Sequence, residues 1–287
     1  MSRYSQALGS SPSPTSLLSV ARTIAIEAGE RVLEARRGAV EVAEVKSSSV
    51  DVVTQVDRDA ESFIRSRLAE LRPGDGFLGE ESGGGSGTSG LTWVVDPIDG
   101  TVNFLYGIPH YAVSIAVVEG DPDPQSWRAL AGVVISPASG ELYSAAAGAG
   151  AHLGNSLIRV ADAVPLDQAL VATGFAYLAE TRAEQGAAVA RLLPLVRDIR
   201  RMGTASLDLC AVASGRVNAY FERTLNPWDH AAGALIATEA GASVIGMPRA
   251  RADHRFLLAA HPDVVAALAP LLADLGALPH SDEPTAD

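Results

Sequence analysis

Apolar residues recur every three to four positions in two stretches near the start of the chain, which is the spacing of amphipathic helices. The first stretch predicts a helix from Thr15 to about Gly38, with an inward face made of Leu17, Val20, Ala21, Ile24, Ala28 and Val32. The second predicts a helix from about Val53 to Leu71, ended by Pro73-Gly74, with an inward face made of Val56, Ala60, Phe63, Ile64 and Leu68. Residues 1–14 are rich in Ser and Pro and are predicted to be disordered.

Shorter apolar runs follow, and their length indicates strands. Residues 92–96 (TWVVD) predict a buried strand, and the runs at 112–118, 130–135 and 141–146 are spaced like an antiparallel set. The segment SGGGSGTSG, residues 82–90, has the composition of a flexible loop.

The second half alternates between the two kinds of element. We expect strands near 169–173, 217–221, 243–246 and 256–259, and helices at 181–197, after Thr204, from Asp229 and from Pro262 to about Leu275. Strands and helices that mix without strict βαβ alternation favour a layered α/β or α+β architecture. We expect one unit over 15–278, with halves of about 15–155 and 156–278, and an acidic tail at 279–287.

Composition narrows the function classes. The chain has 287 residues with 22 basic and 34 acidic side chains, a net charge of −12, which argues against direct nucleic-acid binding. The single cysteine, Cys210, excludes an intramolecular disulfide and a zinc site of paired thiolates. It lies in an apolar helical stretch and is expected to pack in the core. The single cysteine fits a reducing cytoplasm, which is the expected location. No membrane partner is expected, because no apolar run approaches the roughly 20 residues that span a bilayer.

The segment Asp96-Pro97-Ile98-Asp99-Gly100-Thr101 is the focus of the candidate chemistry. Asp96 is expected to end a strand, Pro97 to favour a tight turn, and Asp99 to point into the same space as Asp96. Two close carboxylates repel each other unless a proton or a cation lies between them, and Mg²⁺ prefers oxygen ligands. Gly100-Thr101 could open a short helix whose backbone N–H groups bind phosphate. The alternative is an ordinary Asp cap and turn.

Other acids allow two interpretations from the residues alone. Glu80-Glu81 are either solvated loop acids or lie at a sheet edge like Asp96. Asp229 is either an N-cap carboxylate or a site residue, and Asp57 is by itself more typical of a surface acid on a helix. The six histidines form no zinc-binding HExxH pair, and GxSxG is absent.

Taken together, the motifs resemble those of the inositol monophosphatase family of Mg²⁺-dependent phosphatases, especially its bacterial, actinobacterial-like members. The matching segments, in order, are Lys46–Ser48, Asp51–Asp57, Gly79–Ser82, Trp93–Phe104, Gly203–Ser206 and Trp228–Gly233 continuing to Glu239–Gly241. The resemblance covers roughly residues 16–275. It implies the fold of that family, a layered α-β-α-β-α sandwich of the α+β class.

The resemblance also implies residue roles. The first Mg²⁺ would be held by Glu80, Asp96 and the carbonyl of Ile98, the second by Asp96, Asp99 and Asp229, and a third by Glu80 with waters. Thr101 and Asp57 would orient the attacking water, and Glu80 would help to activate it. Substrate contacts would come from Asp99, Gly100, Thr101, Ala205, Glu222 and Asp229. Lys46, Asp51 and Glu81 would support the site.

The activity implied is Mg²⁺-dependent hydrolysis of a small phosphorylated polyol, first of all myo-inositol monophosphate, by a homodimer sensitive to lithium and without a covalent intermediate. The alternatives are a histidinol-phosphate phosphatase, a fructose-1,6-bisphosphatase or a 3′-phosphoadenosine phosphate phosphatase, a transcription-associated partner role, and a cation-binding structural protein. The chain departs from the family pattern at Arg223 and His230. We expect Arg223, which follows Glu222, to be a solvated surface residue; the alternative is contact with a second anionic group.

Overall fold

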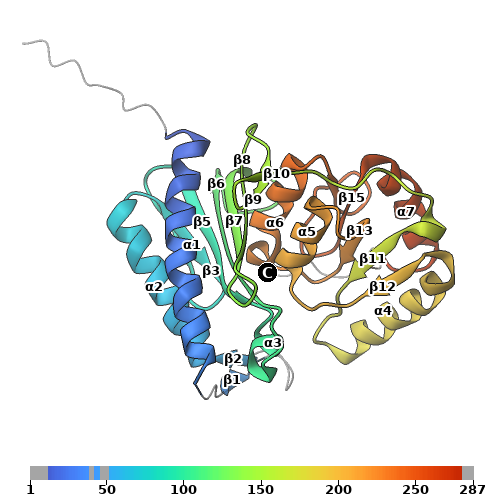
Figure 1. The fold of residues 1–287 in the computed structure, drawn as a ribbon, viewed down its shortest axis with the longest axis horizontal. Coiled ribbons are helices and arrows are strands. Elements are labelled where there is room, and N and C mark those ends of the chain that lie inside the picture. Colours follow the sequence, from blue (N-terminus) through green and yellow to red (C-terminus); the bar gives the residue numbers. More distant parts are fainter. Residues whose placement is uncertain (1–11, 39–41, 46–51, 280–287) are drawn as a thin grey trace, which may run out of the picture.

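The computed structural model describes residues 12–38, 42–45 and 52–279. Its helices and sheets stack in five layers, a pair of helices, a sheet, a second pair of helices, a second sheet and a third pair of helices (Figure 1). This arrangement confirms the α-β-α-β-α sandwich. The predicted segment 1–14 lies largely outside the described residues, and so do the predicted supporting residues Lys46 and Asp51.

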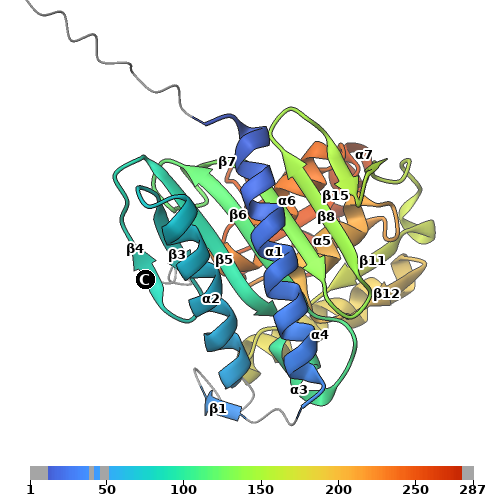
Figure 2. The ribbon, with the colours of Figure 1, turned by 60° about the vertical axis from the view of Figure 1, so that its left-hand side comes forward.

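The first layer consists of α1 (Pro14–Arg36) and α2 (Gln55–Leu71), which cover one face of the first sheet (Figure 2). α1 begins one residue before the predicted start, capped by the Ser13 side chain, which accepts from the Ser16 N–H at 3.2 Å. α2 begins two residues later than predicted, because β2 (Val52–Thr54) pairs with β1 (Val42–Val45) just before it. The predicted inward positions of both helices are buried or half-buried.

The first sheet has eight strands in the order β10-β9-β8-β7-β6-β5-β3-β4, antiparallel except for β3 and β5. The strands are β3 (Gly76–Gly79), β4 (Gly83–Gly85), β5 (Leu91–Asp99), β6 (Ala112–Glu119), β7 (Arg128–Ser136), β8 (Glu141–Ala146), β9 (Ala151–Leu153) and β10 (Ser156–Ile158). The predicted antiparallel set is therefore confirmed. The predicted loop at 82–90 is partly wrong, because three glycines form the edge strand β4 through backbone bonds that need no side chain.

A bulge near the end of β5 decides where the site lies. Asp96 pairs with Ser114 and Asp99 with Ala112, so two residues of β5 oppose one residue of β6. Side chains alternate along a strand, and residues three apart normally face opposite sides. The extra residue restores a common side for Asp96 and Asp99. The expected strand end and tight turn at Pro97 are thus wrong: the strand continues through a bulge to Asp99.

The second sheet has the order β12-β11-β13-β15-β14 and is parallel at β12-β11-β13. Its strands are β11 (Leu170–Thr173), β12 (Asp198–Arg200), β13 (Ala219–Glu222), β14 (Ser243–Ile245) and β15 (Leu257–Ala260). The other helices are α3 (Thr101–Tyr106), α4 (Ala179–Leu192), α5 (Ala205–Ala213), α6 (Pro227–Glu239) and α7 (Pro262–Asp274), with short 3₁₀ turns at Leu166–Gln168 and Leu193–Leu195. The helix predicted over 181–197 ends early, because Pro194 follows it and β12 begins at Asp198.

Three apolar clusters separate the layers. One lies between α1, α2 and the first sheet, a second surrounds α5 and α6 between the sheets, and a third lies between the second sheet and α4 and α7. Because α5 and α6 are covered on both sides, most of their residues are buried, including Cys210 as predicted. In the described part of the chain, no helix combines the length and apolarity needed to cross a bilayer.

Candidate functional site

Four carboxyl groups meet where the first sheet faces the helices of the central layer. Glu80 follows β3, Asp96 and Asp99 flank the bulge of β5, and Asp229 lies in the first turn of α6. Burial, and then the charges of Glu80, Asp99 and Asp229, hold the pKa of Asp96 well above its usual value. Burial, followed by Asp99 and Glu80, does the same to the pKa of Asp229. The four carboxyl groups therefore lie close enough for their charges to act on the pKa values of Asp96 and Asp229.

In three of these carboxyl groups, one oxygen accepts a hydrogen bond from a backbone N–H group. Asp96 Oδ1 accepts from the Ile98 N–H at 3.0 Å, and Asp99 Oδ2 accepts from the Ser206 N–H at 2.7 Å at the start of α5. Asp229 Oδ2 accepts from the Asn226 N–H at 2.7 Å. Asn226 is the N-cap of α6, so the N-cap interpretation of Asp229 is wrong: it is the third helical residue and forms half of a capping box.

Asp57 and Thr101 are in contact, as the resemblance implies. Asp57 Oδ1 lies 3.2 Å from the Thr101 hydroxyl, and Oδ2 accepts from the N–H of Thr54 at 2.9 Å and from its hydroxyl. Asp57 is 0% exposed, so its interpretation as a surface acid is wrong. Burial raises the pKa of Asp57 to about 6 against the opposing effect of these hydrogen bonds, and the nearby Glu81 charge also raises it.

The start of α3 requires glycine. Gly100 has φ of +90°, and a Cβ there would lie 2.4 Å from Thr204 Oγ1 and 3.2 Å from the Gly203 carbonyl oxygen. The short helix predicted after Gly100 is confirmed, since α3 begins at Thr101. The close approach brings the beginnings of α3 and α5 together beside the carboxyl cluster.

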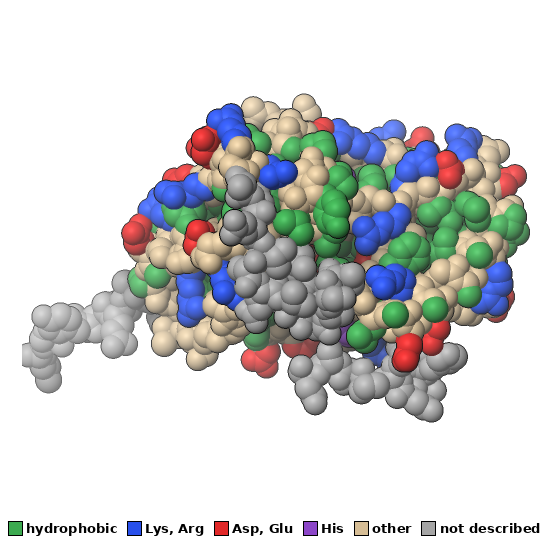
Figure 3. Space-filling model, turned by 90° about the horizontal axis from the view of Figure 1, so that it is seen from below, with side chains coloured by type: hydrophobic (Ala, Val, Ile, Leu, Met, Phe, Trp, Pro, Cys, Tyr) green, Lys and Arg blue, Asp and Glu red, His purple; other side chains and the backbone are tan. Residues whose placement is uncertain are grey.

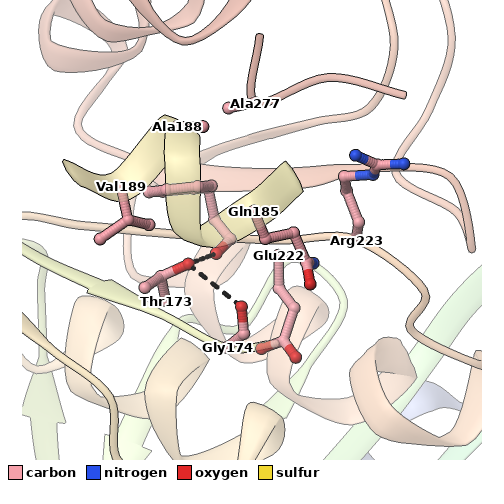
Figure 4. A pocket seen from close by; sticks show the side chains of 9 residues that line it. Thr173, Gly174, Gln185, Ala188, Val189, Glu222, Arg223 and Ala277 are labelled. Atoms are coloured by element: carbon pink, nitrogen blue, oxygen red, sulfur yellow. Dashed lines mark hydrogen bonds between the residues drawn. The ribbon is translucent and has the colours of Figure 1, made fainter. Parts of the chain in front are cut away.

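Glu222, at the end of β13, approaches the cluster from the second sheet. Burial raises its pKa to about 7, and the Tyr220 hydroxyl donates to Oε2 at 2.6 Å. Figure 4 shows the Glu222 side chain over Gly174, where a Cβ would lie 1.9 Å from Oε2. The charge of Glu222 also contributes to the raised pKa of Asp229, after burial and the charges of Asp99 and Glu80. Ala205, another of the predicted substrate contacts, is the first residue of α5.

Arg223 contradicts its predicted surface position. Only 2% of Arg223, which is labelled in Figure 4, is exposed, and its Nη1 lies 3.4 Å from the Glu184 carboxylate of α4. The side chain lines a small cavity of about 10 Å³ together with Gln185 and Thr173. The sequence places Arg223 after a strand but does not reveal that α4 covers this end of β13.

Two buried acids were missed. Asp208 on α5 is 1% exposed, and neither carboxylate oxygen has a hydrogen-bond partner among the residues that the structure describes. Burial, then Glu222 and Asp99, hold its pKa well above normal. A single acid within the apolar stretch LDLCAVA is the signal that could have identified it. Glu61 is 3% exposed and follows Asp57 by four residues, the spacing that puts both on one helix face.

The donor set matches the chemistry of a hard cation. Its groups offer only oxygen atoms, and a cation among them would offset the burial and the mutual repulsion that raise the pKa values of Asp96 and Asp229. As the side chains of the described residues lie, no three His, Cys, Asp or Glu groups already form a set that could hold a metal ion. The carboxylates would therefore have to draw together around it.

Comparison with known proteins gives consistent similarities over most of the chain. Residues 13–277 match the inositol monophosphatase family. The Inositol-1-monophosphatase SuhB of Mycobacterium tuberculosis (strain ATCC 25618 / H37Rv) is 46% identical over 273 residues, 88% of this chain and 91% of that protein. The Nus factor SuhB of Xylella fastidiosa (strain Temecula1 / ATCC 700964) is 44% identical over 202 residues, 70% of each chain. The solved structure of Mycobacterium tuberculosis SuhB has a TM-score of 0.77 at 43% identity, covering 92% of this chain and 98% of that one.

Proposed function

The chain belongs to the inositol monophosphatase family of metal-dependent phosphatases, and from this premise we propose that it hydrolyses a small phosphate monoester with Mg²⁺, in the first place myo-inositol monophosphate. The observation that carries the proposal is the proximity of Glu80, Asp96, Asp99 and Asp229, whose charges, in addition to burial, raise the pKa values of Asp96 and Asp229. A pocket of like charges alone would repel a phosphate group. Bound cations would present positive charge to the phosphate group, so that the pocket attracts the phosphate.

Two Mg²⁺ ions, or three, would be held by these residues once their carboxylates draw together. The first would take Glu80, Asp96 and the Ile98 carbonyl, the second Asp96, Asp99 and Asp229, and a third Glu80 with waters. Bound there, the ions would supply charge neutralisation and a water of lowered pKa. Asp96 would be the shared ligand, and the charges of the other three acids, in addition to burial, raise its pKa.

The protein's own groups would orient the attacking water and the phosphate. The Thr101 hydroxyl, directed by the Asp57 carboxylate at 3.2 Å, would hold the water, and Glu80 would help to take its proton. The backbone N–H groups of Gly100 and Thr101 would bind phosphate oxygens. In this scheme the water oxygen would form the new bond to phosphorus as the ester P–O bond breaks, and the departing alkoxide would take up a proton to leave as the alcohol. No covalent enzyme intermediate would form.

The sugar side would be recognised by Glu222, Ala205, Asp229 and Asp99. Glu222 suits a polyol because a carboxylate accepts hydrogen bonds from hydroxyl groups, and Tyr220 fixes its orientation. Arg223 forms an ion pair with Glu184 of α4. We therefore do not assign Arg223 to the binding of a second anionic group on the substrate. Glu81, whose charge acts on Asp57, would support the site, and we retain the same expectation for Lys46 and Asp51.

A phosphate-release screen tests the substrate. The panel contains inositol-1-phosphate, histidinol phosphate, fructose-1,6-bisphosphate and 3′-phosphoadenosine 5′-phosphate, each with Mg²⁺ and with EDTA, and Asp96→Asn is the control for contaminating activity. We expect the highest kcat/KM for inositol-1-phosphate, and only with Mg²⁺. A higher kcat/KM for another substrate would replace the inositol assignment, and equal rates in EDTA would contradict the metal chemistry.

A second role in transcription is favoured by one observation, the 44% identity with a protein named Nus factor SuhB. On the face seen in Figure 3, basic side chains lie scattered among acidic and hydrophobic ones, so we propose a protein contact for such a role and no direct contact with RNA. The test is retention of the purified chain on immobilised RNA polymerase. Binding by wild type and Asp96→Asn alike would support a role separate from catalysis, and no binding would contradict it.

We further propose a cytoplasmic homodimer inhibited by lithium, as the family resemblance implies. Sedimentation at micromolar concentration would test the dimer. A lithium titration of phosphate release at fixed Mg²⁺ would test the inhibition.

A further inference from the structure

A buried carboxylate outside the proposed metal site holds the turn that carries Glu80. Glu61 Oε2 accepts from the Glu81 N–H at 2.8 Å, and Oε1 accepts from the Ser82 N–H at 2.8 Å. The Glu80 N–H donates to the Val95 carbonyl oxygen of β5 at 3.3 Å. Three consecutive backbone N–H groups are therefore held between β5 and α2, and two of them are held by one side chain.

The surroundings of Glu61 are built for this contact. The residue is only 3% exposed, and each of its two carboxylate oxygens accepts from a backbone N–H group. A Cβ on Gly79 would lie 2.3 Å from Glu61 Oε2 and 2.6 Å from its carboxyl carbon. The absence of a side chain at Gly79 thus lets the Glu61 carboxylate reach the backbone of the turn.

One helix face connects this turn with the residues proposed to orient water. Asp57 and Glu61 are four residues apart on α2 and lie on the same face. Asp57 contacts Thr101, and Glu61 binds the residues that follow Glu80. A rigid helix therefore fixes the distance between the proposed water-orienting pair and the proposed metal ligand.

We propose that Glu61 is a positioning residue that holds the Glu80 turn in the place needed for cation binding. This inference rests on the proposed function, because it takes Glu80 as a metal ligand. Glu61 itself contacts neither the cation nor the substrate, since both of its carboxylate oxygens are directed to backbone N–H groups. Its loss should therefore weaken metal binding through the position of Glu80.

The test measures Mn²⁺ binding to EDTA-treated, full-length protein by the loss of the free-ion electron paramagnetic resonance signal. Glu61→Gln keeps the size of the side chain but places an amide NH₂ where a backbone N–H needs an acceptor. We expect its Mn²⁺ dissociation constant to rise about 10–100-fold, the usual effect of losing a group that orients a metal ligand. The kcat at saturating Mg²⁺ should recover substantially, which separates weakened metal binding from a general structural defect.

Two further variants make the test specific. Glu70→Gln removes an exposed acid from the same helix and should bind Mn²⁺ like the wild type. Gly79→Ala should weaken Mn²⁺ binding as Glu61→Gln does, because the added Cβ displaces the Glu61 carboxylate. If Glu61→Gln does not fold, the Mn²⁺ dissociation constant of Gly79→Ala is compared with that of the wild type instead. Binding within twofold of wild type in the folded variants would overturn the inference alone. A wild-type protein that neither binds Mn²⁺ nor releases phosphate would overturn the proposed function, and the inference with it.

Discussion

Replacing Asp57 by Asn should make the metal-free protein more stable and the enzyme inactive. The amide oxygen of the new side chain can accept from the Thr54 N–H, and its NH₂ group can donate to the Thr101 oxygen. The Thr101 hydroxyl can then donate to the Ile98 carbonyl oxygen, which lies 3.0 Å away. Every buried polar group keeps a partner, but the hydrogen bond between position 57 and Thr101 reverses its direction. The threonine loses the carboxylate that directs it toward water.

The size of the stability gain follows from the pKa of Asp57. Burial raises this pKa from 3.8 to about 6, which corresponds to about 3 kcal/mol. Between those two values the folded protein keeps a proton that the unfolded chain has released, so stability falls as the pH rises through this window. The asparagine side chain carries no charge to bury, so Asp57→Asn does not lose folding stability as the pH rises through this window. The gain should be about 3 kcal/mol at pH 8, or roughly 6–12 °C in Tm, about half of that at pH 5, and near zero toward pH 3.8.

The assay is thermal unfolding in EDTA across this pH range, with Asp59→Asn as the control. Asp59 is an exposed acid on the same helix, and its replacement should leave Tm nearly unchanged at every pH. Phosphate release with Mg²⁺ is measured in parallel and should fall by roughly 10²–10⁴-fold in Asp57→Asn. A variant that is less stable than wild type at pH 8, or one whose gain does not shrink with acid, would refute the reasoning about burial.

Three other changes have expected outcomes. Asp96→Asn removes the shared ligand and should lower kcat by roughly 10³-fold or more with the circular dichroism spectrum unchanged; wild-type turnover would contradict the metal assignment. Gly174→Ala puts a Cβ against the Glu222 carboxylate and should raise KM for inositol-1-phosphate roughly tenfold; an unchanged KM would remove Glu222 from the sugar side. Mg²⁺ at 100 times its Kd should stabilise the wild type by about 2.7 kcal/mol in a melting experiment and Asp96→Asn by much less; equal stabilisation would place the ion elsewhere.

Periodicity predicted most helices and strands, and its errors have local causes. β4 escaped detection because strand signals come from side chains, and a run of glycines pairs through its backbone alone. The end of α4 was placed too late because the apolar spacing continues through Pro194, where the helical backbone cannot. The bulge in β5 is invisible to pattern analysis, since it depends on the pairing of β5 with β6, which lies elsewhere in the sequence.

The positions of site residues could be predicted from the sequence where their contacts are with residues nearby in the chain, and not where their contacts are with distant segments. The Asp96–Asp99 pair was predicted from adjacent residues, and the bulge supplies the convergence. Arg223 was misplaced because α4, some forty residues earlier in the chain, covers it through Glu184. Glu61 had a detectable signal in its spacing from Asp57, but its partners are the backbone N–H groups of another segment, which no side-chain pattern reveals.

The most direct test of the account is the anomalous diffraction of crystals soaked in Mn²⁺ at pH 8. The account predicts a strong peak within about 2.0–2.5 Å of the Asp96 carboxylate, shared with Glu80 or with Asp99 and Asp229. The peak should disappear in Asp96→Asn crystals soaked in the same way. Density for Mn²⁺ away from these four carboxylates, or none among them in a protein that still releases phosphate, would contradict the claim that they form its metal site.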